Sequence, residues 1–158
     1  MDTSTPQSLM RAERPPQRRF ALIVTAGFLV LATFQGALAL GAPLGRAAWG
    51  GTYEQLPIGL RLASAIAVGV WIFAALLVLR RAGLHIMPLP MTFTRWGTWV
   101  LVGLLVLSAL VNFASASGWE RFMWGPFAVI MTVLCFVVAR GADTSRKPPV
   151  SDSAAKPS

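Results

Sequence analysis

A few charged side chains lie between long apolar runs, and they are the groups that could do chemistry. Glu54 lies between Arg46 and Arg61, and Glu120 is followed directly by Arg121. A carboxylate can act as an acid or a base, and an arginine can hold an anionic group such as a lipid headgroup. A carboxylate beside arginines is favoured in its charged form, so it is a poor proton donor near neutral pH. This arrangement disfavours an enzyme.

The rest of the sequence has no familiar catalytic or metal-binding pattern. One cysteine, Cys135, and one histidine, His85, can form neither an internal disulfide nor a metal site by themselves. A phosphate-binding P-loop, a nucleophile elbow, a zinc-binding HExxH and a glycine-rich dinucleotide turn are all missing. We therefore predict no catalytic residue, no metal and no cofactor.

The charged groups must be positioned by membrane helices, because the chain is too apolar for a small soluble domain. Its 158 residues are 55% hydrophobic and 13% charged. A helix needs about 20 apolar residues to cross a bilayer. The sequence predicts an all-α membrane protein, a bundle of four transmembrane helices with spans near residues 20–41, 57–79, 96–115 and 122–139.

Two tails flank this predicted transmembrane domain, which covers residues 20–139. Residues 1–19 and 140–158 are rich in proline, serine and basic residues, which predicts disorder. The first span could instead be a secretory signal with a cleavage site near Ala39. Its apolar run of about 22 residues is longer than a signal requires and favours a retained span.

Basic residues predict how the spans are oriented. Most of the fourteen lysines and arginines flank the same side of the predicted membrane: Arg11, Arg14, Arg18, Arg19, Arg80, Arg81, Arg95, Arg140, Arg146, Lys147 and Lys156. The positive-inside rule then places both termini in the cytoplasm and pairs the spans as two antiparallel hairpins. We expect a multi-pass protein of the bacterial cytoplasmic (inner or plasma) membrane. The basic residues are too dispersed to predict nucleic-acid binding.

The remaining polar residues predict a cluster at the outer face. Ser108, Asn112 and Ser115 share one helical face, and Arg61 lies one turn into its helix, where Glu54 or Glu120 could pair with it. The candidate cluster comprises Gln35, Arg46, Trp49, Glu54, Arg61, Asn112, Glu120 and Arg121. It could form interhelical hydrogen bonds or a shallow polar pocket. The tryptophans near both ends of the spans also fit interfacial belts.

Two segments carry a resemblance to a known group. GAPLGRAAWGG with LPIGLRLAS, followed by NFASASGWERFMWGP, resembles uncharacterised small four-span bacterial integral membrane proteins. The resemblance covers roughly residues 20–139. It implies that the shared positions are Gly41, Pro43, Gly45, Trp49, Gly50, Gly51, Leu56, Pro57, Arg61, Asn112, Glu120, Arg121 and Pro126. The group implies a four-span bundle and brings no established activity.

These patterns favour a non-enzymatic binding or accessory module. Its ligand would be a lipid, a small molecule or a partner subunit, and small residues such as Gly27 and Gly69 would permit a homo-oligomer. One alternative is a membrane-embedded enzyme acting on an anionic lipid or small molecule, and another is an oligomeric pore. Ion-coupled transport is not expected, because the span centres contain no ionisable residue.

Overall fold

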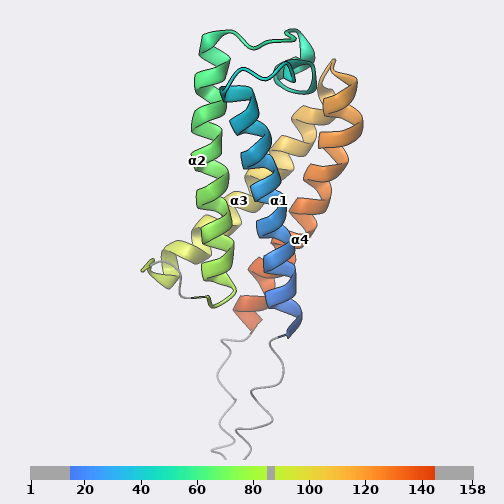
Figure 1. Cartoon of the computed structure of the whole chain (residues 1–158). Coiled ribbons are helices and arrows are strands. Elements are labelled where there is room, and N and C mark those ends of the chain that lie inside the picture. The colour runs from blue at the N-terminus through green and yellow to red at the C-terminus, as the bar shows by residue number, and fades with distance from the viewer. Residues whose placement is uncertain (1–14, 85–87, 145–158) are drawn as a thin grey trace, which may run out of the picture.

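A computed structural model describes residues 15–84 and 88–144, and every regular element in these ranges is helical. Four helices are long and apolar enough to cross a membrane (Figure 1). In chain order, the elements are α1 Pro15–Ala39, the 3-10 turns η1 Gly45–Ala47 and η2 Trp49–Gly51, α2 Ile58–Arg81, α3 Met91–Ala114, the π-helical turn η3 Glu120–Trp124 and α4 Gly125–Thr144.

The helices extend beyond the predicted domain at both ends. α1 begins at Pro15 and α4 ends at Thr144, so residues 15–19 and 140–144 are helical where the sequence predicted disordered tails. A proline at the start of a helix needs no hydrogen-bond partner, and arginine is a good helix former, so charge alone does not end a helix. The rest of both tails, like His85, lies outside the described residues.

The core runs along the axis of the bundle. α1 packs most closely against α2, and α3 packs most closely against α4. The main buried cluster draws on all four long helices: Ala21, Val24 and Phe28; Ala74, Ala75 and Val78; Leu101, Val102 and Leu105; Met131, Cys135 and Val138. Glycine permits close approach, since a Cβ on Gly27 would collide with the sulfur of Met131. Such close packing is the main force between helices in a membrane, where apolar surface gains nothing by leaving water.

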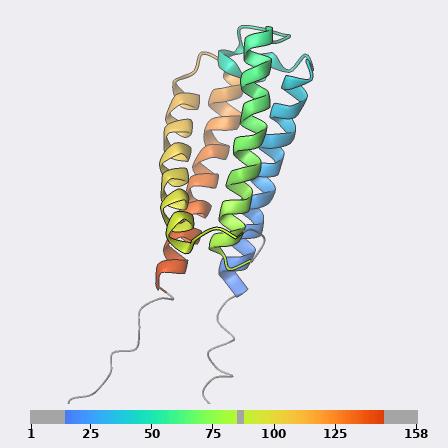
Figure 2. The same cartoon turned by 90° about the vertical axis from the view of Figure 1, so that its left-hand side faces the viewer.

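α3 crosses α2 obliquely, and this crossing shapes the rest of the bundle. The two helices lie close together beside the connection of residues 82–90, where a Cβ on Gly97 would come within 2.9 Å of Leu77. Phe73 and Phe93 also meet there, with ring centroids 6.5 Å apart. Figures 1 and 2 show the helices farther apart at the other end. We call that other end, formed by residues 40–57 and 115–119, the loop end.

A backbone turn stops α1 at the loop end. The Gly41 N–H donates to the Leu38 carbonyl at 3.0 Å, and the Ala42 N–H donates to the Ala37 carbonyl at 2.9 Å. This is a Schellman motif, which requires the left-handed conformation that Gly41 adopts with φ 94°. A Cβ on Gly41 would also lie only 3.2 Å from the guanidinium of Arg61. The turn therefore leaves room for an arginine beside the end of α1.

The connection from α1 to α2 then folds back over the bundle (Figure 1). The Gly45 N–H donates to the Glu54 carbonyl at 3.0 Å, closing the loop. Leu38, Ala48 and Leu56 form a second small core beneath it. The loop is thus a packed cap on the helices.

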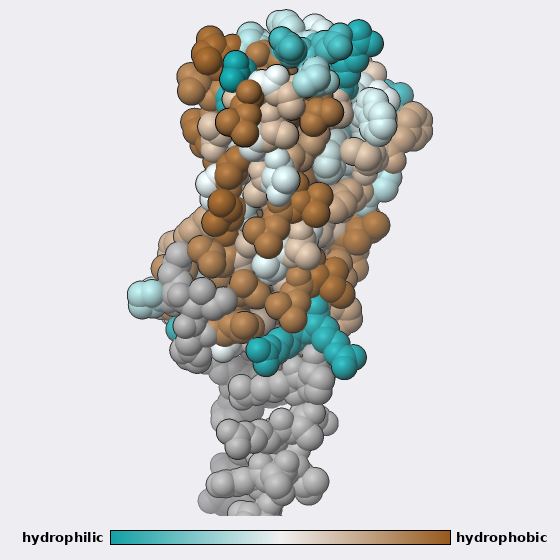
Figure 3. Space-filling view, in the orientation of Figure 1, coloured by the Kyte–Doolittle hydropathy of each residue, from teal (hydrophilic) through white to brown (hydrophobic). Residues whose placement is uncertain are grey.

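Apolar side chains cover much of the outside of the bundle. Ile66, Leu110 and Ile130 are each more than half exposed, at 71%, 62% and 58%. Figure 3 shows hydrophobic residues over the middle of the helices and hydrophilic ones at the loop end and near the opposite end. Such a surface is unfavourable in water and favourable in lipid.

Candidate functional site

A cavity of about 660 Å³ lies among the four long helices, next to the loop end. All four long helices line it, and residues 47–50 and 114–116 line it at the loop end. Its aromatic lining residues are Phe34, Trp49, Trp71, Trp124 and Phe127, and its polar ones are Gln35, Ser108, Asn112, Ser115 and Glu120. A largely apolar cavity with a few convergent polar groups is the usual form of a small-molecule site.

Glu120 ties the two connections of the loop end together. Its carboxylate accepts hydrogen bonds from the Gly50 N–H at 3.0 Å and from the hydroxyl of Ser115. The Ser117 hydroxyl donates to the Arg46 carbonyl at 3.0 Å. We call these bonds and the four residues Gly50, Ser115, Ser117 and Glu120 the cavity rim. The rim joins residues about 70 positions apart in the chain.

The backbone at the rim adopts an uncommon conformation. Trp49, Gly50 and Gly51 have φ angles of 53°, 80° and 73°, all in the left-handed region. This is unfavourable for Trp49, and such strain persists only where the surroundings enforce it. The Trp49 indole N–H donates to the hydroxyl of Ser64 at 3.1 Å, which holds the side chain in place. The turn aims the Gly50 N–H at Glu120.

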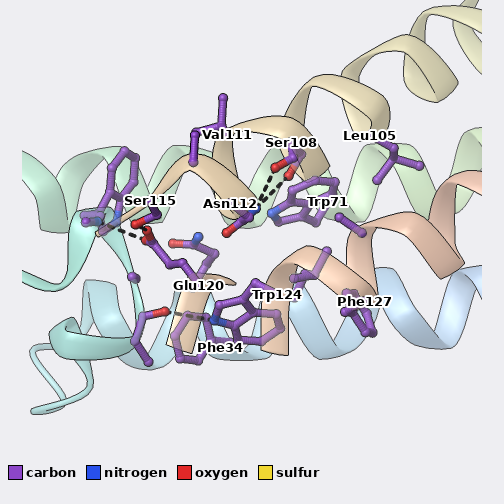
Figure 4. Close-up of a pocket in the computed structure, with 18 of the residues that line it drawn as sticks. Phe34, Trp71, Leu105, Ser108, Val111, Asn112, Ser115, Glu120, Trp124 and Phe127 are labelled. Carbon is purple, nitrogen blue, oxygen red and sulfur yellow. Dashed lines mark hydrogen bonds between the residues drawn. The ribbon is translucent and has the colours of Figure 1, made fainter. Parts of the chain in front are cut away.

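The π-helical turn η3 places two functional groups on the cavity side. Glu120 and Trp124 begin and end this turn, and both line the cavity. The Trp124 indole N–H donates to the Ala47 carbonyl at 2.8 Å, which fixes the ring against the loop. π-helical turns are rare and often occur at functional sites. Figure 4 shows the Glu120 carboxylate beside Ser115, with Asn112 and then Trp71 further along the cavity and Trp124 on the facing side.

The amide nitrogen of Asn112 is bonded within α3. The Asn112 amide nitrogen donates to the Ser108 carbonyl at 2.8 Å and approaches the Ser108 hydroxyl at 3.3 Å. For Asn112 and Ser108 this differs from interhelical hydrogen bonding, which was one of the two roles that the sequence suggested for the polar residues. Across the cavity, Gln35 Oε1 is buried without a partner among the described residues. An unbonded buried acceptor is costly and calls for an explanation.

Half of the predicted cluster lines the cavity. Gln35, Trp49, Asn112 and Glu120 line it, whereas Arg46, Glu54, Arg61 and Arg121 do not. Arg46 and Glu54 pair with each other at 3.6 Å on the exposed outer surface of the loop. We call the exposed side of the loop that carries Arg46 and Glu54 the loop surface.

The expected pairing of Arg61 with Glu54 or Glu120 is wrong. Arg61 Nε donates instead to the Ala39 carbonyl at 3.0 Å. This carbonyl belongs to the last turn of α1, where carbonyls lack helical partners and attract positive charge. Arg121 similarly donates to the Ser115 carbonyl at 2.8 Å. Main-chain carbonyls therefore accept hydrogen bonds from both Arg61 and Arg121, whereas the sequence suggested a carboxylate partner for Arg61.

Several cavity residues were not predicted. Trp71 stacks on Phe28 with centroids 5.5 Å apart, and Trp124 contacts Phe34 at 4.8 Å. An interfacial belt accounts for tryptophans near span ends, whereas Trp71 lies in the middle of an apolar run. Its position was the available signal that this tryptophan has another role.

Glu120 is the one charged side chain on the lining within the described residues, so a second acid or base is missing there. Comparison of the sequence with protein-family models, with curated proteins and with solved structures gives no match.

Proposed function

We propose that the chain is a multi-pass protein of the bacterial cytoplasmic membrane, built from two antiparallel hairpins with both termini in the cytoplasm. The apolar surface of four long helices supports membrane insertion, and the basic residues at one side of the spans support the orientation. The loop end would then face outward. The resemblance to small four-span bacterial membrane proteins belongs to this proposal.

The proposed role is non-enzymatic binding of a small amphipathic molecule, either a lipid or a free compound, in the cavity at the outer face. The observation that carries this role is the combination of 660 Å³ of space, aromatic walls and convergent Glu120 and Asn112. Exposed lining residues such as Val111 and Ala114 supply an entry at the loop end. An apolar chain would contact the aromatic wall while its polar head meets the rim.

The alternative of an enzyme that holds an anionic lipid with arginine is less well supported. It would need Arg61 or Arg121 at the cavity, and neither lines it. Both donate to main-chain carbonyls instead. A homo-oligomer or an association with a membrane subunit is compatible with a binding role.

Labelling of single cysteines tests the orientation. A membrane-impermeant maleimide applied to intact cells should label Gly118→Cys and leave Val150→Cys unlabelled until the membrane is opened. The native Cys135 is buried and should not react, which gives the background. The reverse pattern would overturn the outward orientation of the loop end.

Quenching of tryptophan fluorescence tests binding. The full chain is titrated in maltoside micelles with 12-bromododecanol, whose bromine quenches a nearby indole. We expect saturable quenching that Ala114→Phe removes, because Ala114 is an exposed lining residue at the entry and a phenylalanine there would obstruct it. Leu110→Phe is the matched control, since Leu110 is 62% exposed on the same helix and does not line the cavity. Equal quenching in the two variants would contradict the proposed binding site.

A further inference from the structure

The charge of the cavity indicates what its ligand carries. Glu120 accepts hydrogen bonds only from neutral donors among the described residues, namely the Gly50 N–H and the Ser115 hydroxyl. The ion pair that the structure shows at the loop end joins Arg46 to Glu54 and does not involve Glu120. Neutral donors fix the direction of a carboxylate without cancelling its charge, and each oxygen retains a second lone pair. The rim therefore presents an oriented negative charge to the cavity.

We propose that the ligand is an amphiphile with a protonated amine, whose ammonium group binds between Glu120 and the aromatic wall. This inference rests on the proposed function and specifies its ligand class. A lipid headgroup and a free alkylamine both offer such an ammonium group, and their chemistry at the site is the same.

Aromatic rings provide the second part of the ammonium site. Trp71 and Trp124 line the same cavity as Glu120 and Asn112, and Figure 4 shows Trp124 across the cavity from Asn112. The face of an indole attracts a cation more strongly than a phenyl face does. The hydrogen bond from Trp124 to Ala47 and the contact with Phe34 at 4.8 Å fix that ring before a ligand arrives. A cavity that combines a carboxylate with indole rings held in place should bind a ligand with a cationic headgroup more tightly than one with a neutral headgroup.

Unused acceptors distinguish a protonated amine from a quaternary ammonium. Gln35 Oε1 lines the cavity as a buried acceptor without a partner in the described part of the chain. The Asn112 nitrogen is already engaged with Ser108, which leaves its amide oxygen to accept. A primary ammonium has N–H groups for such acceptors, and a trimethylammonium has none. We therefore expect the primary amine to bind more tightly.

The test compares three probes that share one brominated chain: 12-bromododecylamine, its trimethylammonium analogue and 12-bromododecanol. Tryptophan quenching of the full chain should rank the amine first and the alcohol last. Glu120→Gln should lower the ratio of amine to alcohol affinity about tenfold, as expected for loss of one charged contact. Glu54→Gln is the matched control and should leave the ratio unchanged, because Glu54 lies on the exposed loop surface.

A second variant keeps the proposal testable if Glu120→Gln does not fold. Gln35→Leu removes the unpartnered acceptor and should bring the amine and trimethylammonium affinities together. An unchanged amine preference in every folded variant would overturn the ammonium site. If the alcohol binds as tightly as the amine and Ala114→Phe still blocks both, the ligand class is wrong while the cavity remains a binding site. If no probe binds, the proposed function itself fails.

The source of the ammonium is resolved in nanodiscs of defined composition. Discs of phosphatidylethanolamine offer a primary ammonium, whereas discs of phosphatidylcholine offer only a trimethylammonium at the same net charge. If 12-bromododecylamine binds more weakly in the first composition, the ammonium comes from a lipid headgroup. Equal amine affinity in the two compositions assigns a free amine. Weaker amine binding in phosphatidylcholine than in phosphatidylethanolamine would contradict the proposal.

Discussion

Glu120 of the cavity rim and Glu54 of the loop surface are the same residue type at the same end of the bundle, in very different surroundings. Glu54 pairs with Arg46 at 3.6 Å, with the two side chains 67% and 74% exposed. Glu120 is half-buried and bonds two neutral donors on different connections. At this end of the bundle, a carboxylate therefore contributes more to stability by accepting hydrogen bonds from the two connections than by pairing with an exposed arginine.

The largest effect should come from the glycines that shape the rim. A Cβ on Gly51 would lie 2.9 Å from Ser117 Cβ and 3.0 Å from the Arg46 carbonyl, in a left-handed backbone. Gly51→Ala should lower the free energy of unfolding by about 3 kcal/mol, from strain plus collision. Gly50→Ala has the same strain without a neighbour within 4 Å and should cost about 1 kcal/mol. Unfolding in mixed micelles measures both, and equal losses would mean that the rim is not closely packed.

Removal of each glutamate compares the two regions directly. Glu120→Ala leaves the Gly50 N–H and the Ser115 hydroxyl without their acceptor, so it should destabilise the protein by about 2 kcal/mol. Glu54→Ala should change stability by about 0.5 kcal/mol or less, because water solvates what remains. Unfolding in mixed micelles again gives both values. A loss at Glu54 as large as that at Glu120 would erase the distinction between the regions.

Arg61 extends the comparison to a basic residue, because it donates to a main-chain carbonyl and not to a carboxylate. Arg61→Gln should cost about 1 kcal/mol through loss of the bond to the Ala39 carbonyl. A double-mutant cycle between Arg61 and Glu120 should give a coupling below about 0.5 kcal/mol, the value expected for residues without shared contacts. A coupling above about 1 kcal/mol would restore the ion-pair network that the sequence suggested.

The sequence predicts the four long helices well and their ends less well. Charge-free apolar runs coincide with the four long helices, each of which has the roughly 20 apolar residues that a bilayer span needs. The same criterion misplaces the start of α3, which begins at Met91 after the cap residue Pro90 and passes through Arg95. An arginine interrupts a charge-free run, but it does not interrupt a helix.

The site is only partly visible in the sequence. Gln35 and Asn112 were placed at one end by their positions in the spans, and Trp49 and Glu120 by the connections in which they lie. All four line the cavity. The partners of the arginines could not be predicted, because main-chain carbonyls are present at every residue and leave no mark in a sequence. Trp71 was also missed, since its role depends on the divergence of α3 from α2.

The smallest effect should come from the loop surface itself. A double-mutant cycle between Arg46 and Glu54 should give about 0.5 kcal/mol or less, because exposed pairs gain little and lose side-chain freedom. That coupling should fall further in about 1 M salt, where the screening length is about 3 Å. The rim should keep most of its strength in the same salt, because the bonds from Gly50 and Ser115 to Glu120 use neutral donors. Equal salt sensitivity of the two regions would show that long-range charge, rather than the bonded backbone, holds the loop end together.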